Sequence, residues 1–406
     1  MIIAHAISLP ALAITTSMLT VHLGVHEDLQ VPGDDQGSTP EYEFSSALQT
    51  ALLAQAATAP MHMQTGSASA ARAEMLDIWD RLRAGYGIPV KTKPSVQAHV
   101  ETFHRHARLF EQNMQHSEPY LFHVLDRVKA RGLPTELALL PVIESAYDPF
   151  ARSPAGPTGI WQFMPATARE AGLREDWWYD GRRDIVASTE AALDYLTALQ
   201  QRYDGDWLLA LSAYNAGSAR VNRAIRRNRS QGRPVDFWHL PLPEETRNYV
   251  PKLLALRTII ADPAAYGIAL PELANSSYFT SIDTGGQIDL QVAARLAGTS
   301  LDELQRLNPG LNRSITPPGG THRLLVPRAS AQHFRIRLAL LPDEQRVQSI
   351  RYRVRPGDTL SEIALNSRTT VSRLRKLNQL ESSRIIAGKL LIVPVSGHGE
   401  NAKSKS

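Results

Sequence analysis

One glutamate, Glu144, stands at the end of a segment that is otherwise largely apolar, "LPTELALLPVIE". A carboxylate among apolar and aromatic neighbours loses hydration, which disfavours its charged form and raises its pKa. A general acid that works near neutral pH needs such a raised pKa. Alternatively, Glu144 caps a loop or pairs with Arg152 on the surface, and for an isolated helix-end glutamate this is the commoner case. The residue alone leaves both interpretations open.

The residues that follow Glu144 are of the kinds that form a binding cleft. The run "SAYDPFARSPAGPTGIWQFMP" is rich in small and turn-forming residues and ends with Trp161 and Phe163. Glycines allow a tight backbone fold that a polymer can approach closely. The two aromatic side chains could form the wall of a sugar-binding cleft. The stretch therefore predicts a polymer-binding groove beside the carboxylate.

Three motifs, beginning with this stretch, resemble those of a known family. "ESAYDPFARSPAGPTGIWQFMPATA" is followed by "GDWLLALSAYNAG" (205–217) and "LPEETRNYVPK" (242–252). In this order they resemble the motifs of the family 1 lytic transglycosylases, which have a goose-lysozyme-like domain, and the resemblance covers about residues 95–265. It implies cleavage of the β-1,4 bond between N-acetylmuramic acid and N-acetylglucosamine in peptidoglycan. The implied reaction uses no water and leaves a 1,6-anhydromuramyl end.

By matching position, the resemblance assigns the acid–base role to Glu144. One carboxylate suffices in this reaction because the attacking hydroxyl belongs to the substrate, whereas ordinary glycosidases need a second carboxylate. Asp148 is the nearest acid along the chain, and its "YDP" context indicates a turn. Whether Asp148, Asp180 or Asp184 comes near the cleft stays open at this point. A hydrolytic muramidase and a catalytically silent wall-binding protein are the alternative functions.

The resemblance also implies substrate contacts at Ser153, Gly159, Gln162, Met164, Tyr214, Asn215 and Tyr249. Ser153 and Gln162 would bind the sugar or its acetamido groups, and Gly159 would permit close approach. For Met164 and Tyr214, packing in the core is the stronger alternative. The chain departs from the family at Pro157-Thr158, where small residues such as alanine are usual.

An all-α domain, residues 73–270, is expected to position these residues. The sequence predicts helices at 95–114, 118–131, 135–144, 165–172, 184–203, 206–227 and 244–262. Ser188-Thr189 and Asp206 can cap helix starts, and Gly132 and Gly205 stand where helices end. Pro141 should bend the helix that carries Glu144, one turn before it.

An internal repeat follows this block. With a shift of 70 residues, "LQVAARLAGTSLDELQRLNP" aligns with "LSEIALNSRTTVSRLRKLNQ". Each copy predicts strand, helix, helix, strand, so residues 277–328 and 350–396 are two α+β modules joined by a linker at 328–350. The second copy resembles a LysM domain, which implies glycan binding at Gly357, Asp358, Thr359, Leu360 and, more weakly, Ile386. The first copy lacks the "PGDTL" loop and resembles a degenerate LysM module.

Composition limits the remaining possibilities. The 406 residues are 43% hydrophobic, contain no cysteine, and have a net charge of +4. Such a chain can form several folded domains, but no disulfide and no thiolate-bound metal. The segment from Arg220 to Arg233 holds six arginines and no acid, which is usual for a solvated helix end and also suits an anionic wall polymer. No cofactor, metal site or nucleic-acid motif is predicted.

The two ends of the chain are predicted to lie outside the folded domains. Residues 1–72 read as an apolar segment followed by a disordered linker, and 397–406 as a disordered tail. The apolar start, to about residue 23, fits a poorly formed export signal or a misassigned start better than a membrane anchor. We expect a protein of the bacterial cell envelope, in the periplasm, whose partner is the peptidoglycan glycan strand. Peripheral association with the outer membrane and the oligomeric state stay open.

Overall fold

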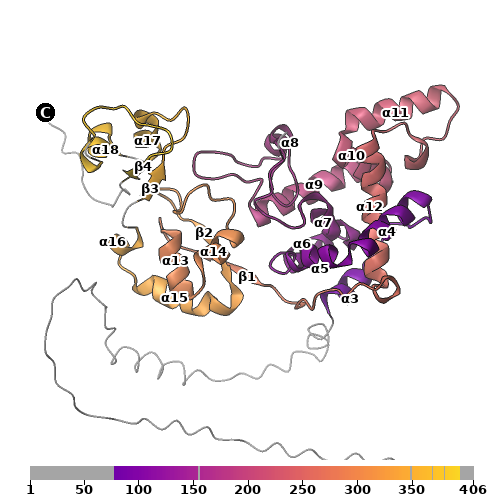
Figure 1. Cartoon of the computed structure of the whole chain (residues 1–406), viewed down its shortest axis with the longest axis horizontal. Helices are drawn as coiled ribbons and strands as arrows, with labels where there is room; N and C mark the ends of the chain where they lie inside the picture. Colours follow the sequence, from indigo (N-terminus) through magenta and orange to yellow (C-terminus); the bar gives the residue numbers. More distant parts are fainter. Residues whose placement is uncertain (1–76, 154–155, 348–349, 368, 379, 394–406) are drawn as a thin grey trace, which may run out of the picture. The chain divides into compact units, whose positions relative to one another are not determined.

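A computed structural model describes residues 77–153, 156–347, 350–367, 369–378 and 380–393 of the chain (Figure 1). The predictions for residues 1–72 and for the tail at 397–406 lie outside the described residues.

The first domain is helical, as the sequence predicts, and the described residues from 77 to 278 contain no named strand. Its elements are α3 (Ile78–Arg83), α4 (Pro94–Arg105), α5 (Ala107–Gln115), α6 (Leu121–Ala130), η1 (Thr135–Leu139), α7 (Leu140–Ser145), α8 (Pro165–Glu170), α9 (Ile185–Arg202), α10 (Trp207–Ala216), α11 (Ser218–Ser230), η2 (Phe237–His239), α12 (Glu244–Ala261) and η3 (Ala264–Tyr266).

The core of this domain forms around α12, which packs against α4, α7 and α10, while α10 also packs against α9 (Figure 1). Leu196 of α9, Leu211 of α10 and Leu253 of α12 are all fully buried. Burying a side chain of this kind stabilises the fold by about 1.5–3 kcal/mol. The helices that carry the site residues are therefore anchored in one hydrophobic core.

Two of the predicted helices are each divided in two. The predicted 95–114 helix breaks at His106, and the predicted 206–227 helix breaks at Gly217, whose φ of 84° suits glycine. The apolar pattern continues across both breaks, so periodicity alone could not reveal them. Gly217 is the single residue between the end of α10 and the start of α11.

The segment before Glu144 also differs from the prediction. Residues 135–139 form a 3₁₀ turn, and Pro141 lies in the first turn of α7 instead of bending a longer helix. Proline is tolerated there because the N–H groups of the first turn have no acceptor within the helix, so the missing N–H costs no hydrogen bond.

One of the predicted caps is wrong and three helix-end signals are confirmed. Ser188 and Thr189 lie buried inside α9, and Asp184 caps that helix by accepting from the Ala187 N–H at 2.8 Å. Asp206 caps α10, and Gly132 and Gly205 have the positive φ of helix-terminating glycines.

The two small modules have the predicted order of elements. In the first, β1 (Phe279–Asp283) pairs antiparallel with β2 (Arg323–Pro327) around α13 (Leu290–Ala297) and α14 (Leu301–Leu307). In the second, β3 (Ile350–Arg353) pairs antiparallel with β4 (Leu390–Val393) around α17 (Leu360–Asn366) and α18 (Val371–Leu377).

The predicted linker at 328–350 is wrong for most of its length. It forms η4 (Arg328–Ser330), α15 (Ala331–Leu340) and α16 (Asp343–Arg346). Phe334 and Leu338 of α15 are buried against Leu304, Leu324 and their neighbours in the first module. This segment therefore completes the core of the first module.

Candidate active site

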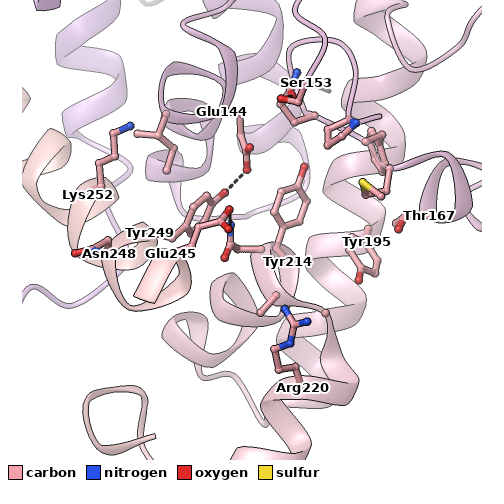
Figure 2. Close-up of a pocket in the computed structure, with 18 residues that line it drawn as sticks. Glu144, Ser153, Thr167, Tyr195, Tyr214, Arg220, Glu245, Asn248, Tyr249 and Lys252 are labelled. Carbon is pink, nitrogen blue, oxygen red and sulfur yellow. Dashed lines mark hydrogen bonds between the residues drawn. The ribbon is translucent and has the colours of Figure 1, made fainter. Parts of the chain in front are cut away.

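A cavity of about 770 Å³ lies between α7, the loop before α8, α10 and α12 (Figure 2). Of the eight site residues expected in the helical domain, seven line it: Glu144, Ser153, Gln162, Met164, Tyr214, Asn215 and Tyr249. Segments more than 100 residues apart in sequence thus meet at one place.

Glu144 occupies the last turn of α7, directly before an unusual piece of backbone. Ala146 and Tyr147 have φ values of 51° and 59°, a left-handed conformation that costs non-glycine residues about 1–3 kcal/mol each. Two hydrogen bonds help to hold it. The Tyr147 hydroxyl donates to the Ala138 carbonyl at 2.7 Å, and the Ser145 hydroxyl donates to the Ile160 carbonyl at 3.1 Å. The chain thereby turns sharply away just after the carboxylate.

The carboxyl group of Glu144 has the electrostatics of a general acid. Burial raises its pKa from 4.5 to about 7, while the Tyr249 hydroxyl and the Lys252 ammonium act to lower the pKa and Glu245 acts to raise it. Tyr249 donates to Oε1 of Glu144 at 2.6 Å (Figure 2). At neutral pH the group is therefore divided between an acid that can donate a proton and a base that can accept one.

Ser153 and Gln162 are held to each other across the loop that walls the cavity. The Ser153 hydroxyl donates to Oε1 of Gln162 at 3.1 Å, and Nε2 of Gln162 donates to the Gly159 carbonyl at 2.8 Å. Gln162 has a φ of 49°. Both side chains thus shape the loop as well as facing the cavity.

Pro157, the departure from the family pattern, fits this loop. Its carbonyl accepts from the Ser153 N–H at 3.0 Å, and Thr158 pairs with Phe163 in both directions at 3.2 and 3.3 Å. The proline faces the cavity without disturbing these bonds.

Tyr214 and Asn215 form the floor between α10 and α12. The Tyr214 hydroxyl donates to the Trp161 carbonyl at 2.8 Å, and Oδ1 of Asn215 accepts from Thr246 at 2.8 Å. Tyr214 therefore packs within the domain and also lines the cavity. Met164 is 45% exposed at the cavity, so the core-packing alternative is wrong for it.

Gly159 requires a correction, because it does not line the cavity. A Cβ at this position would lie 2.1 Å from the carbonyl oxygen of Arg182, and the residue has a φ of 80°. The close approach that needs a glycine here is an approach by the protein's own backbone, and the sequence alone could not identify that neighbour.

The acids near Glu144 are not the ones considered from sequence. Asp148 accepts from the Phe150 N–H at 2.9 Å in the predicted turn, Asp180 pairs with Arg182, and Asp184 caps α9. None of the three is among the described residues that line the cavity, but Glu245 is. Its position could have been found, because Glu245, Tyr249 and Lys252 recur at helical spacing and share one face of α12.

In the second module, most of the expected glycan-binding residues also have structural contacts. Asp358 accepts from the Tyr352 hydroxyl and from the Arg355 N–H, Thr359 forms a capping box with Glu362, and Leu360 is buried. Gly357 has a φ of 89°, and Ile386 is 61% exposed. The loop residues thus support a surface on which Ile386 is accessible.

Comparison with known families agrees with the fold. Residues 126–237 match the transglycosylase SLT domain, residues 278–343 the LysM-like domain of lytic transglycosylase MltD, and residues 352–394 the LysM domain. The class is therefore that of lytic transglycosylases with an SLT domain and C-terminal LysM modules.

Individual relatives narrow the class to one family. The chain is 37% identical over 341 residues to membrane-bound lytic murein transglycosylase D of Escherichia coli K12, covering 80% of this chain and 74% of that one. It belongs to the membrane-bound lytic murein transglycosylase D family. It is also 39% identical over 112 residues to the peptidoglycan transglycosylase gp16 of phage T7, covering 27% of this chain and 8% of the phage protein. Among solved structures, an inactive mutant of the lytic transglycosylase Slt from Pseudomonas aeruginosa matches with 26% identity and a TM-score of 0.29, over 37% of this chain and 25% of that one.

A membrane-spanning helix is not found in the described parts of the chain, where every helix is too short or too polar.

Proposed function

We propose that this protein is a peptidoglycan lytic transglycosylase that cleaves the bond between N-acetylmuramic acid and N-acetylglucosamine and leaves a 1,6-anhydromuramyl end. The observation that carries the proposal is the pair formed by Glu144 and Tyr249 in the wall of the large cavity. Membership of the family of lytic murein transglycosylase D supports it.

The proposed reaction has two proton transfers, both at Glu144. The protonated carboxyl gives its proton to the glycosidic oxygen as the bond from that oxygen to C1 breaks. The carboxylate then takes the proton of the muramyl C6 hydroxyl, whose oxygen forms a new bond to C1. A pKa of about 7 suits a group that must act first as acid and then as base. The Tyr249 hydroxyl stabilises the carboxylate between the two transfers.

The remaining cavity residues would hold the glycan during this reaction. Ser153, Gln162 and Asn215 carry hydroxyl and amide groups that can bind acetamido groups, and Met164 offers an accessible apolar surface. Tyr214 supports the floor. We propose that the second module adds glycan affinity at the surface around Gly357 and Ile386, and that the protein works in the periplasm. We propose the division into domains 73–270, 277–346 and 350–396, in which η4, α15 and α16 belong to the first small module.

Glu245 makes product analysis the decisive test of the function. A muramidase would need a second carboxylate to activate water, and Glu245 lines the same cavity. We expect purified protein to release muropeptides with anhydromuramyl ends from sacculi, each lighter by one water than its hydrolytic counterpart in mass spectrometry. Products with ordinary reducing ends alone would contradict the proposal.

Tyr249→Phe is expected to move the pH dependence of cleavage. The Tyr249 hydroxyl acts to lower the pKa of Glu144, which is about 7. Removal of the hydroxyl should therefore raise this pKa above 7. The high-pH limb of kcat/KM, where the acid loses its proton, should shift by about one pH unit to higher pH. Tyr195→Phe is the matched control, because Tyr195 lines the same cavity but bonds to Ser218. An unshifted profile for Tyr249→Phe would contradict the assigned role.

A further inference from the structure

Helix α11 carries a row of arginines that the proposed reaction does not use. Arg220, Arg223 and Arg227 are spaced three and four residues apart, so they lie on one face of the helix. The three line a second cavity of about 360 Å³, whose other wall is Pro241, Leu242 and Pro243. No aspartate or glutamate occurs in the sequence between Asp206 and Asp236.

The charges of this face are not neutralised within the described residues. The guanidinium groups of Arg220, Arg223 and Arg227 are exposed, and they take part in none of the hydrogen bonds or ion pairs found there. By contrast, Arg127 and Arg131 of the same domain both pair with Glu190. Like charges three or four residues apart weaken a helix. An external anion would remove that repulsion.

The second cavity adjoins the active-site cavity. Arg220 lines both of them, and Figure 2 shows it beyond Tyr214, at the end of the view opposite Ser153. A group bound along α11 can therefore be covalently attached to a glycan whose sugars occupy the active site. Glu244 and Glu245 follow Pro243 in the sequence, but neither lines the second cavity, and Glu245 bonds to Asn215.

We propose that the arginine face of α11, formed by Arg220, Arg223 and Arg227, binds the carboxylates of the peptide stem that the muramyl residue carries. This inference rests on the proposed function. A guanidinium matches a carboxylate with two parallel hydrogen bonds. The prolines of the opposite wall have no N–H to donate, so the arginines supply the recognition.

The dimensions of the face agree with a short peptide. Seven residues of helix separate Arg220 from Arg227, a rise of about 10 Å. An extended peptide of about three or four residues covers a similar length. An anionic lipid surface would also attract arginines, but it would not need a cavity that shares a residue with the active site.

The test compares two substrates and two variants of the full chain. Arg223→Gln/Arg227→Gln removes two charges from the second cavity and spares Arg220, which also lines the active site. Arg226→Gln/Arg229→Gln removes two charges from the same helix at positions that do not line that cavity. The substrates are glycan strands that bear peptide stems, and the same strands after an amidase has removed the stems.

For stem-bearing strands, we expect Arg223→Gln/Arg227→Gln to raise KM about tenfold with kcat unchanged. For strands without stems, KM should equal that of the wild type, and the control variant should match the wild type on both substrates. Equal KM increases on both substrates, or no increase on stem-bearing strands, would overturn the proposal. Loss of binding to phosphatidylglycerol vesicles with an unchanged KM would assign the face to lipid and also overturn it. Wild-type protein that cleaves neither substrate would instead refute the proposed function.

Discussion

Glu144→Gln is expected to reduce the release of soluble muropeptides from sacculi by about 10³-fold or more. A general acid or base typically contributes 10²- to 10⁴-fold, and here one residue performs both steps. The glutamine amide keeps the size of the side chain and can still contact Tyr249. It can neither protonate the leaving oxygen nor accept the proton of the C6 hydroxyl. Turnover is measured from the mass-resolved products at pH 6 to 7, where the wild type should hold both protonation states.

Asp148→Asn is the matched control for this change. Asp148 is an exposed carboxylate four residues further along, and an asparagine oxygen can still accept from the Phe150 N–H. Activity close to that of the wild type is expected. If Glu144→Gln kept more than a tenth of the wild-type rate, another group would have to supply the proton, and Glu245 would be the first to examine.

Glu144→Gln should also change the dependence of stability on pH. The Glu144 carboxyl titrates near 4.5 in the unfolded chain and near 7 in the folded protein. The folded state therefore keeps the proton to higher pH, so the contribution of Glu144 to the free energy of unfolding is most favourable below pH 4.5 and falls as the pH rises to about 7. Glutamine does not titrate. Between pH 4 and pH 8, the free energy of unfolding of Glu144→Gln should therefore rise by about 2 kcal/mol relative to that of the wild type, after allowance for partial exposure. Urea unfolding at the two pH values measures this difference.

Gly159→Ala is expected to destabilise the helical domain by about 3 kcal/mol or more. Its Cβ would lie 2.1 Å from the carbonyl oxygen of Arg182 and 3.2 Å from the Cα of Arg183. Both neighbours are backbone, so neither can swing aside as a flexible side chain would. The φ of 80° adds a conformational cost. The denaturation midpoint should fall, and so should activity, because the Gly159 carbonyl accepts from Gln162 at the cavity wall.

Gly172→Ala separates the steric cost of the added Cβ from the conformational cost of a positive φ. Gly172 has a similar φ of 74°, but nothing lies within 4 Å of the position its Cβ would take. Gly172→Ala should therefore lose only about 1 kcal/mol of stability, which comes from the backbone conformation alone. Similar losses for the two variants would contradict the steric explanation for Gly159.

The catalytic acid was easier to predict from the sequence than the residues that surround it in the cavity. Glu144 could be proposed as the acid because its apolar setting and three motifs point to one residue, and the repeat predicted both small modules. Glu245 was missed although it shares a face of α12 with Tyr249, because only Tyr249 of that family motif was considered for the site. The role of Gly159 was misread because its neighbour Arg182 is contributed by a later loop.

Helix ends were predicted where the signal is local and missed where packing decides. Asp206 and Gly205 stand next to each other, and the structure uses both as expected. Ser188 and Thr189 are equally good caps in isolation, but Thr189 lies inside α9, where it accepts from the Trp161 indole at 3.0 Å. A buried indole N–H needs such a partner, and that need arises only in the folded domain.

Glu144 ends each proposed cycle as it began, because the proton that it gives to the leaving oxygen is replaced by the one from the C6 hydroxyl. No proton has to enter from or leave to the solvent between one cut and the next. A glycan that fills the cavity and covers Glu144 therefore does not stall the catalyst. An enzyme that regains its proton from its substrate in this way needs no proton exchange with solvent between cuts, so its rate need not depend on buffer concentration.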